Sequence, residues 1–230
     1  MDAEPDIAGI AALIGDSARA AMLWTLLDGR ARPAGELAYR ARISAQSASQ
    51  HLAKLVDAGL LAMERQGRHR YFRLANPEVA RVIESLAVLA QGRAQSRAQP
   101  RSRRTPAELR YARTCYDHLA GELGVRLLER LLAAGYLMER GEGYEVSPSG
   151  QDWLRELGVD LAVVRSRRRR FACPCADWSE HRPHLGGALG AALLQAFLQR
   201  DWLRCSRDSR AVLPSVRGRT ELARRLPGVL

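Results

Sequence analysis

Residues 44–61 read SAQSASQHLAKLVDAGLL, and this stretch decides the fold of the chain. Ser44 is a residue type that caps the start of a helix, and Ala48 and Leu52 begin an apolar stripe at helical spacing. Gly59 then ends the helix, because glycine readily adopts the left-handed backbone that follows a last turn. The other side of the predicted helix carries short polar side chains near its beginning, as a helix that reads the major groove of DNA requires.

A strand pattern replaces the helical pattern after this stretch. Residues 60–64 and 70–74 flank a turn at residues 66–68, which predicts a β-hairpin with the basic tip RQGRHR. Glutamines on the helix can pair with adenine, serines can bind phosphates or bases, and cations at the tip would lie along the flanking backbone or minor groove. Alone, the helix pattern is also typical of an ordinary solvated helix face, and the hairpin pattern is also typical of an ordinary charged hairpin. The predicted DNA-contacting residues are Ser44, Gln46, Ser47, Ser49, Gln50, His51, Lys54, Arg65, Arg68, His69 and Arg70.

Helical patterns also lie on both sides of these elements. Residues 7–14 and 16–28 predict two helices before them, and a short helix follows Pro33. Residues 77–90 predict a last helix, whose apolar stripe is broader than one small domain can bury. We expect this surplus, together with the helix at 7–14, to form a dimer interface.

The charge balance favours a polyanionic partner. The 230 residues include 36 Lys and Arg against 25 Asp and Glu, a net charge of +11 that is carried almost entirely by arginine. The planar guanidinium can bind a phosphate or the edge of a guanine through two hydrogen bonds. No apolar run reaches the length of a membrane span, and the first residues are acidic where a secretory signal is basic. The charge therefore predicts double-stranded DNA as the partner, and the lack of a predicted span or secretory signal predicts a cytoplasmic protein.

The chain is long enough for two domains. Residues 1–91 form the predicted winged helix-turn-helix DNA-binding and dimerisation domain, and the polar, basic residues 92–106 form a linker. In the C-terminal domain, residues 107–230, a helix, a hairpin and a second helix recur at 127–157 and, more weakly, at 193–222. The predicted fold class is mainly α with small β-hairpin wings (α+β), with winged-helix-like units in the C-terminal domain.

Residues 47–61, SASQHLAKLVDAGLL, and 65–74, RQGRHRYFRL, resemble the signature and the wing of the ArsR/SmtB repressors. The resemblance covers about residues 7–90, and it implies a homodimer that leaves its operator when an inducer binds. Members of that family hold metal ions with a cysteine pair near the start of the recognition helix, or with His and Asp on the last helix. Here the recognition helix has no cysteine and the helix at 77–90 has no histidine, so a sensing site has to lie elsewhere.

Cysteines of the C-terminal half offer ligands for such a site. Cys173 and Cys175 are two residues apart beside the arginine run 167–170, which favours thiolates, and thiolates bind soft ions. His118 and Cys205 can approach them in space. For Cys173 and Cys175, redox sensing and a structural role are the alternatives. The predicted metal ligands, for zinc, cadmium, lead or arsenic(III), are Cys173, Cys175, Cys115 and His184.

The sequence therefore predicts a sequence-specific DNA-binding transcriptional regulator, a homodimeric repressor that an inducer releases. The inducer is a soft metal or metalloid ion bound by C-terminal cysteines or, as the alternative, a small molecule or a redox signal. A non-inducible architectural DNA binder is a competing class, for which the basic excess suffices. An enzyme is not predicted, because no nucleophile, phosphate-binding loop or paired carboxylates stand at useful spacing.

Overall fold

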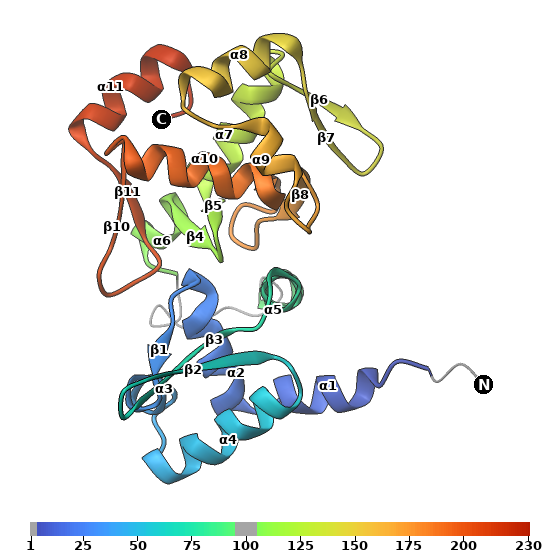
Figure 1. The fold of residues 1–230 in the computed structure, drawn as a ribbon, viewed down its shortest axis with the longest axis vertical. Coiled ribbons are helices and arrows are strands. Elements are labelled where there is room, and N and C mark those ends of the chain that lie inside the picture. The colour runs from blue at the N-terminus through green and yellow to red at the C-terminus, as the bar shows by residue number, and fades with distance from the viewer. Residues whose placement is uncertain (1–3, 95–104) are drawn as a thin grey trace. The chain divides into compact units, whose positions relative to one another are not determined.

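A computed structural model describes residues 4–94 and 105–230 of the chain. The chain divides between Ile83 and Glu84 into two compact units, whose elements are labelled in Figure 1. This division falls within one helix, α5 (Pro77–Ala94).

The predicted linker begins near the end of that helix. Of residues 92–106, the first three still belong to α5. Residues 95–104 lie outside the described residues. The prediction of a linker therefore falls mostly on a part of the chain that the structure does not describe.

The first unit is a winged helix-turn-helix, which confirms the predicted fold class for this part of the chain. Its strands form one antiparallel sheet in the order β1-β3-β2. The strand β1 was not predicted, because two residues that include a proline show no strand alternation. In chain order, and followed by the start of α5, its elements are α1 (Ile7–Ile14), α2 (Ser17–Thr25), η1 (Leu26–Asp28), β1 (Arg32–Pro33), α3 (Ala34–Ala41), α4 (Ala45–Asp57), β2 (Leu61–Gln66) and β3 (His69–Leu74).

Local signals in the sequence set the ends of these helices. Asp16 accepts a hydrogen bond from the backbone N–H of Arg19 at 2.9 Å, and Ser44 accepts one from Ser47 at 3.1 Å. Both side chains satisfy donors that a helix start leaves without partners. The apolar faces that these ends position form the core of the unit, which includes Met22, Leu23, Leu26, Leu27, Leu37, Leu52, Leu55, Phe72 and Leu74.

The second unit consists of helices and two-stranded antiparallel hairpins. The helix–hairpin–helix patterns at 127–157 and 193–222 are confirmed, whereas the hairpins β4–β5 and β8–β9 were not predicted. After the end of α5, its elements are α6 (Ala107–Tyr111), β4 (Arg113–Cys115), β5 (His118–Ala120), α7 (Glu122–Ala133), β6 (Leu137–Arg140), β7 (Gly143–Val146), α8 (Pro148–Glu156), α9 (Leu161–Arg165), β8 (Cys173–Ala176), β9 (Pro183–Gly186), α10 (Gly187–Gln199), β10 (Leu203–Cys205), β11 (Val212–Pro214) and α11 (Val216–Arg225).

Two copies of one motif, hairpin–helix–hairpin–helix, build this unit. The first copy runs from β4 to α8 and the second from β8 to α11 (Figure 1). Their sequences match at HLAGELG, residues 118–124, and HLGGALG, residues 184–190. A Cβ atom on Gly124 or Gly190 would lie 2.6 or 2.2 Å from a carbonyl oxygen of the preceding strand. Both copies therefore need glycine at the same place, where helix and strand pack closely.

The two copies pack reciprocally. Helix α7 of the first copy contacts β9 of the second, and α10 of the second contacts β5 of the first. Side chains of both copies form a common core, which includes Leu123, Leu128, Leu131, Trp153, Leu189, Leu194, Phe197 and Trp202. The second unit is therefore one folded body and not two separate winged helices.

Within residues 4–94 and 105–230, no single helix has the length and apolar character that a membrane crossing requires; α1 and the segment Ser17–Asp28 meet the requirement only together, as a pair bent by 83°.

Candidate DNA interface and metal centre

Helix α4 has one buried and one exposed face. Ala48 and Leu52 are buried, whereas Gln46, Gln50 and Lys54 are exposed on the other side. The side-chain amide of a glutamine can donate to and accept from the edge of an adenine in the major groove. The exposed face of α4 therefore has the chemistry of a base-reading surface.

His51 on the same helix lies against α2. Its Nδ1 atom is 3.3 Å from a guanidinium nitrogen of Arg19 and 3.8 Å from the carboxylate of Asp16. Ser47 and Ser49, two other predicted contacts, are half-buried. The side chain of His51 therefore ties α4 to α2, a role that the sequence did not suggest.

The β2–β3 wing carries its positive charge at the tip. The strand register places Arg65 directly opposite Arg70, around a turn in which Gly67 has a φ of 59°. Both arginines are exposed, as are Arg68 and His69. Like charges directly opposite each other destabilise a hairpin, so a bound anion would relieve their repulsion. The wing therefore suits contact with phosphates.

In the second unit, two hairpins bring four buried side chains together. Cys115 lies opposite His118 in β4–β5, and Cys175 lies opposite His184 in β8–β9. One potential ligand atom from each side chain lies within 4.8 Å of the other three. Each copy of the motif therefore contributes one cysteine and one histidine to what we call the cysteine–histidine cluster.

The spacing inside this cluster fits a four-coordinate metal ion. The Sγ atoms of Cys115 and Cys175 are 3.9 Å apart, and the Nε2 atoms of His118 and His184 are 3.2 Å apart. In tetrahedral zinc, Zn–S bonds of about 2.3 Å separate two sulfurs by about 3.8 Å, and Zn–N bonds of about 2.0–2.1 Å separate two nitrogens by about 3.3–3.4 Å. The donors therefore match a tetrahedral, thiophilic ion in number, type and spacing.

Carboxylates lie at the far side of both imidazole rings. The Nδ1 atom of His118 is 3.2 Å from Asp117, and the Nδ1 atom of His184 is 3.2 Å from Asp177. A carboxylate in this position keeps a proton on Nδ1 and leaves Nε2 to bind an ion. Arg169 pairs with Asp117 in turn. Both rings are therefore oriented with Nε2 toward the cluster.

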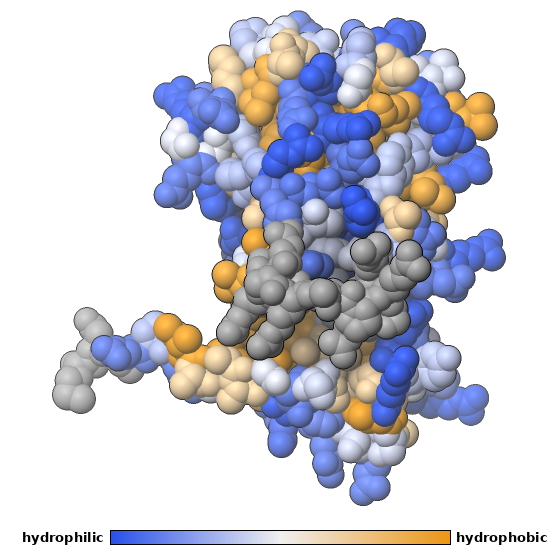
Figure 2. All heavy atoms as spheres, turned by 180° about the vertical axis from the view of Figure 1, so that it is seen from behind, coloured by the Kyte–Doolittle hydropathy of each residue, from blue (hydrophilic) through white to orange (hydrophobic). Residues whose placement is uncertain are grey.

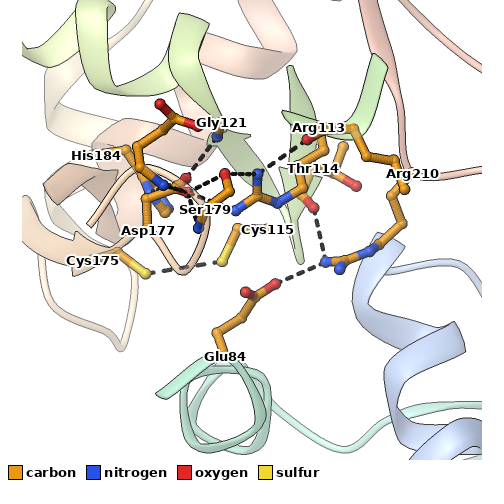
Figure 3. A network of polar contacts seen from close by, with 12 residues as sticks. Glu84, Arg113, Thr114, Cys115, Gly121, Cys175, Asp177, Ser179, His184 and Arg210 are labelled. Carbon is orange, nitrogen blue, oxygen red and sulfur yellow. Dashed lines mark hydrogen bonds and ion pairs between the residues drawn. The ribbon is translucent and has the colours of Figure 1, made fainter. Parts of the chain in front are cut away.

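A buried network surrounds Asp177 (Figure 3). Its carboxylate accepts hydrogen bonds from Arg113 at 2.8 Å, from the backbone N–H of Gly121 at 2.7 Å and from the Ser179 hydroxyl at 2.8 Å. Burial alone would raise the pKa of Asp177, but His184 and Arg113 hold it well below its ordinary value. Asp177 is therefore a permanent anion behind the histidine.

The two cysteines of the cluster have pKa values shifted in opposite directions. The hydrogen bond with Cys115 and those with the two histidines lower the pKa of the Cys175 thiol, while the bond with Cys175 and burial raise the pKa of Cys115. Burial would lower the pKa of His118, but hydrogen bonds to Asp117 and Cys175 raise it to about 9. These shifts favour the thiolate of Cys175, the form that binds soft ions.

Three of the four predicted metal ligands meet in this cluster, namely Cys115, Cys175 and His184. The fourth, Cys173, lies opposite Gly186 in the β8–β9 hairpin and is outside the cluster. The fourth residue of the cluster is His118, which was not among the predicted ligands. A signal for it exists in the spacing Cys-x-x-His at residues 115–118, which sets both residues at facing ends of one tight hairpin.

The strand that ends in Cys115 is also tied to helix α5 (Figure 3). Arg210 donates hydrogen bonds to the Glu84 carboxylate at 2.7 Å and to the backbone oxygen of Thr114 at 3.2 Å. Glu84 is 2 % exposed and Arg210 8 %. Because Thr114 immediately precedes Cys115, one buried ion pair links the end of the strand to α5.

Both units have counterparts in known proteins. A helix-turn-helix domain family matches residues 14–64. The uncharacterized HTH-type transcriptional regulator YdfF of Bacillus subtilis (strain 168) is 43% identical over 209 residues, which cover 90% of this chain and 91% of YdfF. A match of this length includes most of the second unit. The HTH-type transcriptional regulator KmtR of Mycobacterium tuberculosis is 38% identical over 71 residues, 31% of this chain and 54% of KmtR. The solved structure of the cadmium metal-sensor CMTR from Mycobacterium tuberculosis is 30% identical with a TM-score of 0.31, and the match covers 35% of this chain and 82% of CMTR.

Proposed function

This chain belongs to the HTH-type transcriptional regulators, and from that premise we propose that it is a homodimeric ArsR-type repressor of specific sites on double-stranded DNA. It leaves its operator when an inducer binds to the second unit. The family consists of regulators that act through a DNA-binding domain rather than of enzymes. Such a regulator acts in the cytoplasm, where its DNA lies.

The observation that carries the DNA-binding proposal is the joint exposure of amides on α4 and guanidinium groups on the wing. Gln46 and Gln50 face solvent from the helix, and Arg65, Arg68 and Arg70 face it from the hairpin. Amides read base edges, whereas guanidinium groups at a hairpin tip bind phosphates in any sequence. The presence of both favours a sequence-specific regulator over an architectural protein, which needs only the charge.

Uncovered apolar surface supports the homodimer. Figure 2 shows an apolar surface along α1, on which Ile7 is 75 % exposed. On α5, Val82 is 47 %, Leu86 41 % and Leu89 68 % exposed. Monomeric proteins rarely leave large apolar patches in contact with water, and a two-fold contact between identical surfaces would cover these.

We infer that the inducer belongs to the thiophilic metal and metalloid ions, with zinc, cadmium, lead and arsenic(III) as candidates. The cysteine–histidine cluster supports this class, because its two sulfurs and two imidazole nitrogens are donors that such ions prefer. A redox signal is the second candidate function. The 3.9 Å between the Sγ atoms of Cys115 and Cys175 favours it, since a two-electron oxidation of the thiols would join them as a disulfide.

A titration on DNA tests the function directly. The purified, reduced protein is bound to the DNA upstream of its own gene, and release is measured against a panel of metal salts, arsenite and oxidants. Release by a soft ion at a concentration that leaves an unrelated DNA-binding protein bound supports the proposal. Release by oxidants alone supports the redox candidate. Failure to prefer the upstream DNA over a random duplex would contradict the proposed repressor.

Two substitutions on the DNA-binding surface are expected to act differently. Gln50→Ala should weaken binding to the operator by about 1–3 kcal/mol and leave binding to random DNA unchanged, because it removes a base contact. Arg68→Ala should weaken binding to both duplexes, because it removes a phosphate contact. It should also reduce the slope of log affinity against log salt concentration by about 1. Fluorescence anisotropy at several salt concentrations measures both effects.

A matched control comes from the hairpin β6–β7 of the second unit. Arg140 is exposed near the tip of that hairpin, as Arg68 is in the wing. Arg140→Ala should leave both affinities unchanged. Equal losses on operator and random DNA for Gln50→Ala would show that α4 does not read bases.

A further inference from the structure

We propose that one divalent ion of the zinc class, bound by Cys115, His118, Cys175 and His184, joins the two copies of the motif in the second unit. This proposal rests on the metal-binding part of the proposed function and gives the ion a role in the fold. That role does not require the ion to be the inducer.

The ligands stand at equivalent positions in the two copies. In each copy the cysteine lies on the first strand of the leading hairpin and the histidine lies directly opposite on the second strand. Each histidine also begins the shared sequence H-L-x-G-x-L-G. One copy alone therefore supplies two donors, and a four-coordinate site needs both copies.

Each histidine is held in place by the helix of the other copy. A Cβ atom on Gly190 of α10 would lie 3.2 Å from the Cβ atom of His118. A Cβ atom on Gly124 of α7 would lie 3.5 Å from the Cβ atom of His184. The positions of the ligands and the docking of the copies consequently depend on each other, so an ion that fixes the ligands also fixes the docking.

The site is closed and its charges are balanced. All four side chains are buried, with exposed fractions of at most 9 %, so protein donors fill every position of a tetrahedral ion. Closed four-ligand sites are typical of structural zinc, whereas catalytic zinc keeps a position for water. Two thiolates neutralise a divalent ion, and the carboxylates of Asp117 and Asp177 are each paired with an arginine.

A bound ion would also give the two Nε2 atoms and the two sulfurs of the cluster a common partner. The two Nε2 atoms lie 3.2 Å apart and can share only one proton between them, as can the two sulfurs at 3.9 Å. Buried polar atoms without a full set of partners destabilise a fold. A bound ion gives all four donors a partner at once.

Cobalt(II) is the probe for the geometry of the site. The purified, reduced full chain, freed of metal, is titrated with cobalt(II) chloride and then with zinc sulfate. We expect one cobalt per chain, with the intense visible absorption of tetrahedral cobalt and a near-ultraviolet sulfur-to-cobalt charge-transfer band. Zinc should displace it at one equivalent. The melting temperature of the second unit should rise on zinc binding and fall with a chelator.

Cysteine variants identify the ligands. Cys175→Ser should abolish the charge-transfer band of the stoichiometric site and the effect of zinc on melting. Cys173→Ser and Cys205→Ser are matched controls that should keep both. Asp117→Asn keeps all four ligands and tests the site even where a ligand variant does not fold: it should weaken zinc binding by about 10–100-fold.

Two results would overturn the proposal: no stoichiometric cobalt binding by the wild-type chain, or equal binding by the Cys175→Ser and Cys173→Ser variants. Operator binding is measured on the same samples to separate this proposal from the function. Zinc that raises the melting temperature without releasing DNA supports the proposal and removes zinc as the inducer. Intact operator binding without any metal binding overturns the proposal and leaves the DNA-binding regulator standing.

Discussion

Replacing Arg113 with alanine is expected to destabilise the second unit by about 3–5 kcal/mol, the cost of breaking a buried ion pair. The guanidinium is fully buried and donates hydrogen bonds to Asp177 at 2.8 Å, to Ser179 at 2.9 Å and to the backbone oxygen of Leu109 at 3.1 Å. It also lies 4.1 Å from the centre of the Trp178 ring. Removing it leaves the carboxylate of Asp177 buried without its cation. Urea unfolding followed by tryptophan fluorescence measures the loss, because three of the four tryptophans lie in this unit.

An exposed ion pair of the same unit provides the control. Arg155 pairs with Asp152 at 2.6 Å, and their side chains are 73 % and 69 % exposed. Surface pairs contribute about 0–1 kcal/mol, so Arg155→Ala should change the unfolding free energy little. The loss of unfolding free energy for Arg113→Lys should lie between those for Arg113→Ala and Arg155→Ala, because an ammonium keeps the charge but cannot make the bidentate hydrogen bonds of a guanidinium. Similar midpoints for Arg113→Ala and Arg155→Ala would contradict the importance of the buried network.

Gly218→Ala is expected to destabilise the second unit by about 1–3 kcal/mol or more, although alanine normally favours a helix. An added Cβ on Gly218, in the first turn of α11, would lie 1.8 Å from the backbone oxygen of Trp202. The equivalent glycine of the first copy, Gly150 in α8, would meet the oxygen of Tyr136 at 2.1 Å. In both cases backbone has to move, since no side chain can yield. The same unfolding experiment measures both variants.

Gly35 in α3 provides the opposite case. An added Cβ there meets nothing within 4 Å. Gly35→Ala should therefore stabilise the first unit by about 0.5–1 kcal/mol, the ordinary gain for an exposed helix position. A gain in stability for Gly218→Ala as well would mean that the close approach of α11 to the backbone of Trp202 does not exist in solution.

The first unit was predictable because its signals are local. Ser44, Gly59 and Gly67 mark the ends of α4 and the turn of the wing within a few residues of the structure they determine. β1 was not predictable, because the interaction that makes it a strand is not local. Its two residues are in strand conformation only because β3 lies beside them, and Arg32 pairs with Phe72, forty residues away in the chain.

The cysteine–histidine cluster was partly predictable. Residue type pointed to Cys175, Cys115 and His184, but the choice between Cys173 and Cys175 depends on strand register. The register sets Cys175 opposite His184 and Cys173 opposite Gly186. Such register follows from packing against other elements, and strands of three or four residues are too short to reveal it by alternation.

The sequence pattern predicts the repeat in the second unit only from the first helix of each copy onward, and it does not predict the leading hairpins. Helix, hairpin and helix were visible because α7 and α10 have long apolar patterns. The leading hairpins β4–β5 and β8–β9 consist of three and four residues a strand and have no such pattern. The signal for the full repeat is the match between residues 118–124 and 184–190, which begins within the second strand of each leading hairpin.

The reciprocal packing of the two copies has a consequence for how their pairing depends on protein concentration. A polypeptide with one copy would have one cysteine and one histidine of the cluster, and a hairpin whose covering helix belongs to the other copy. Two identical polypeptides related by a dyad would complete each other. In a single chain that carries both copies, each leading hairpin always has its covering helix at hand, so this pairing does not depend on protein concentration.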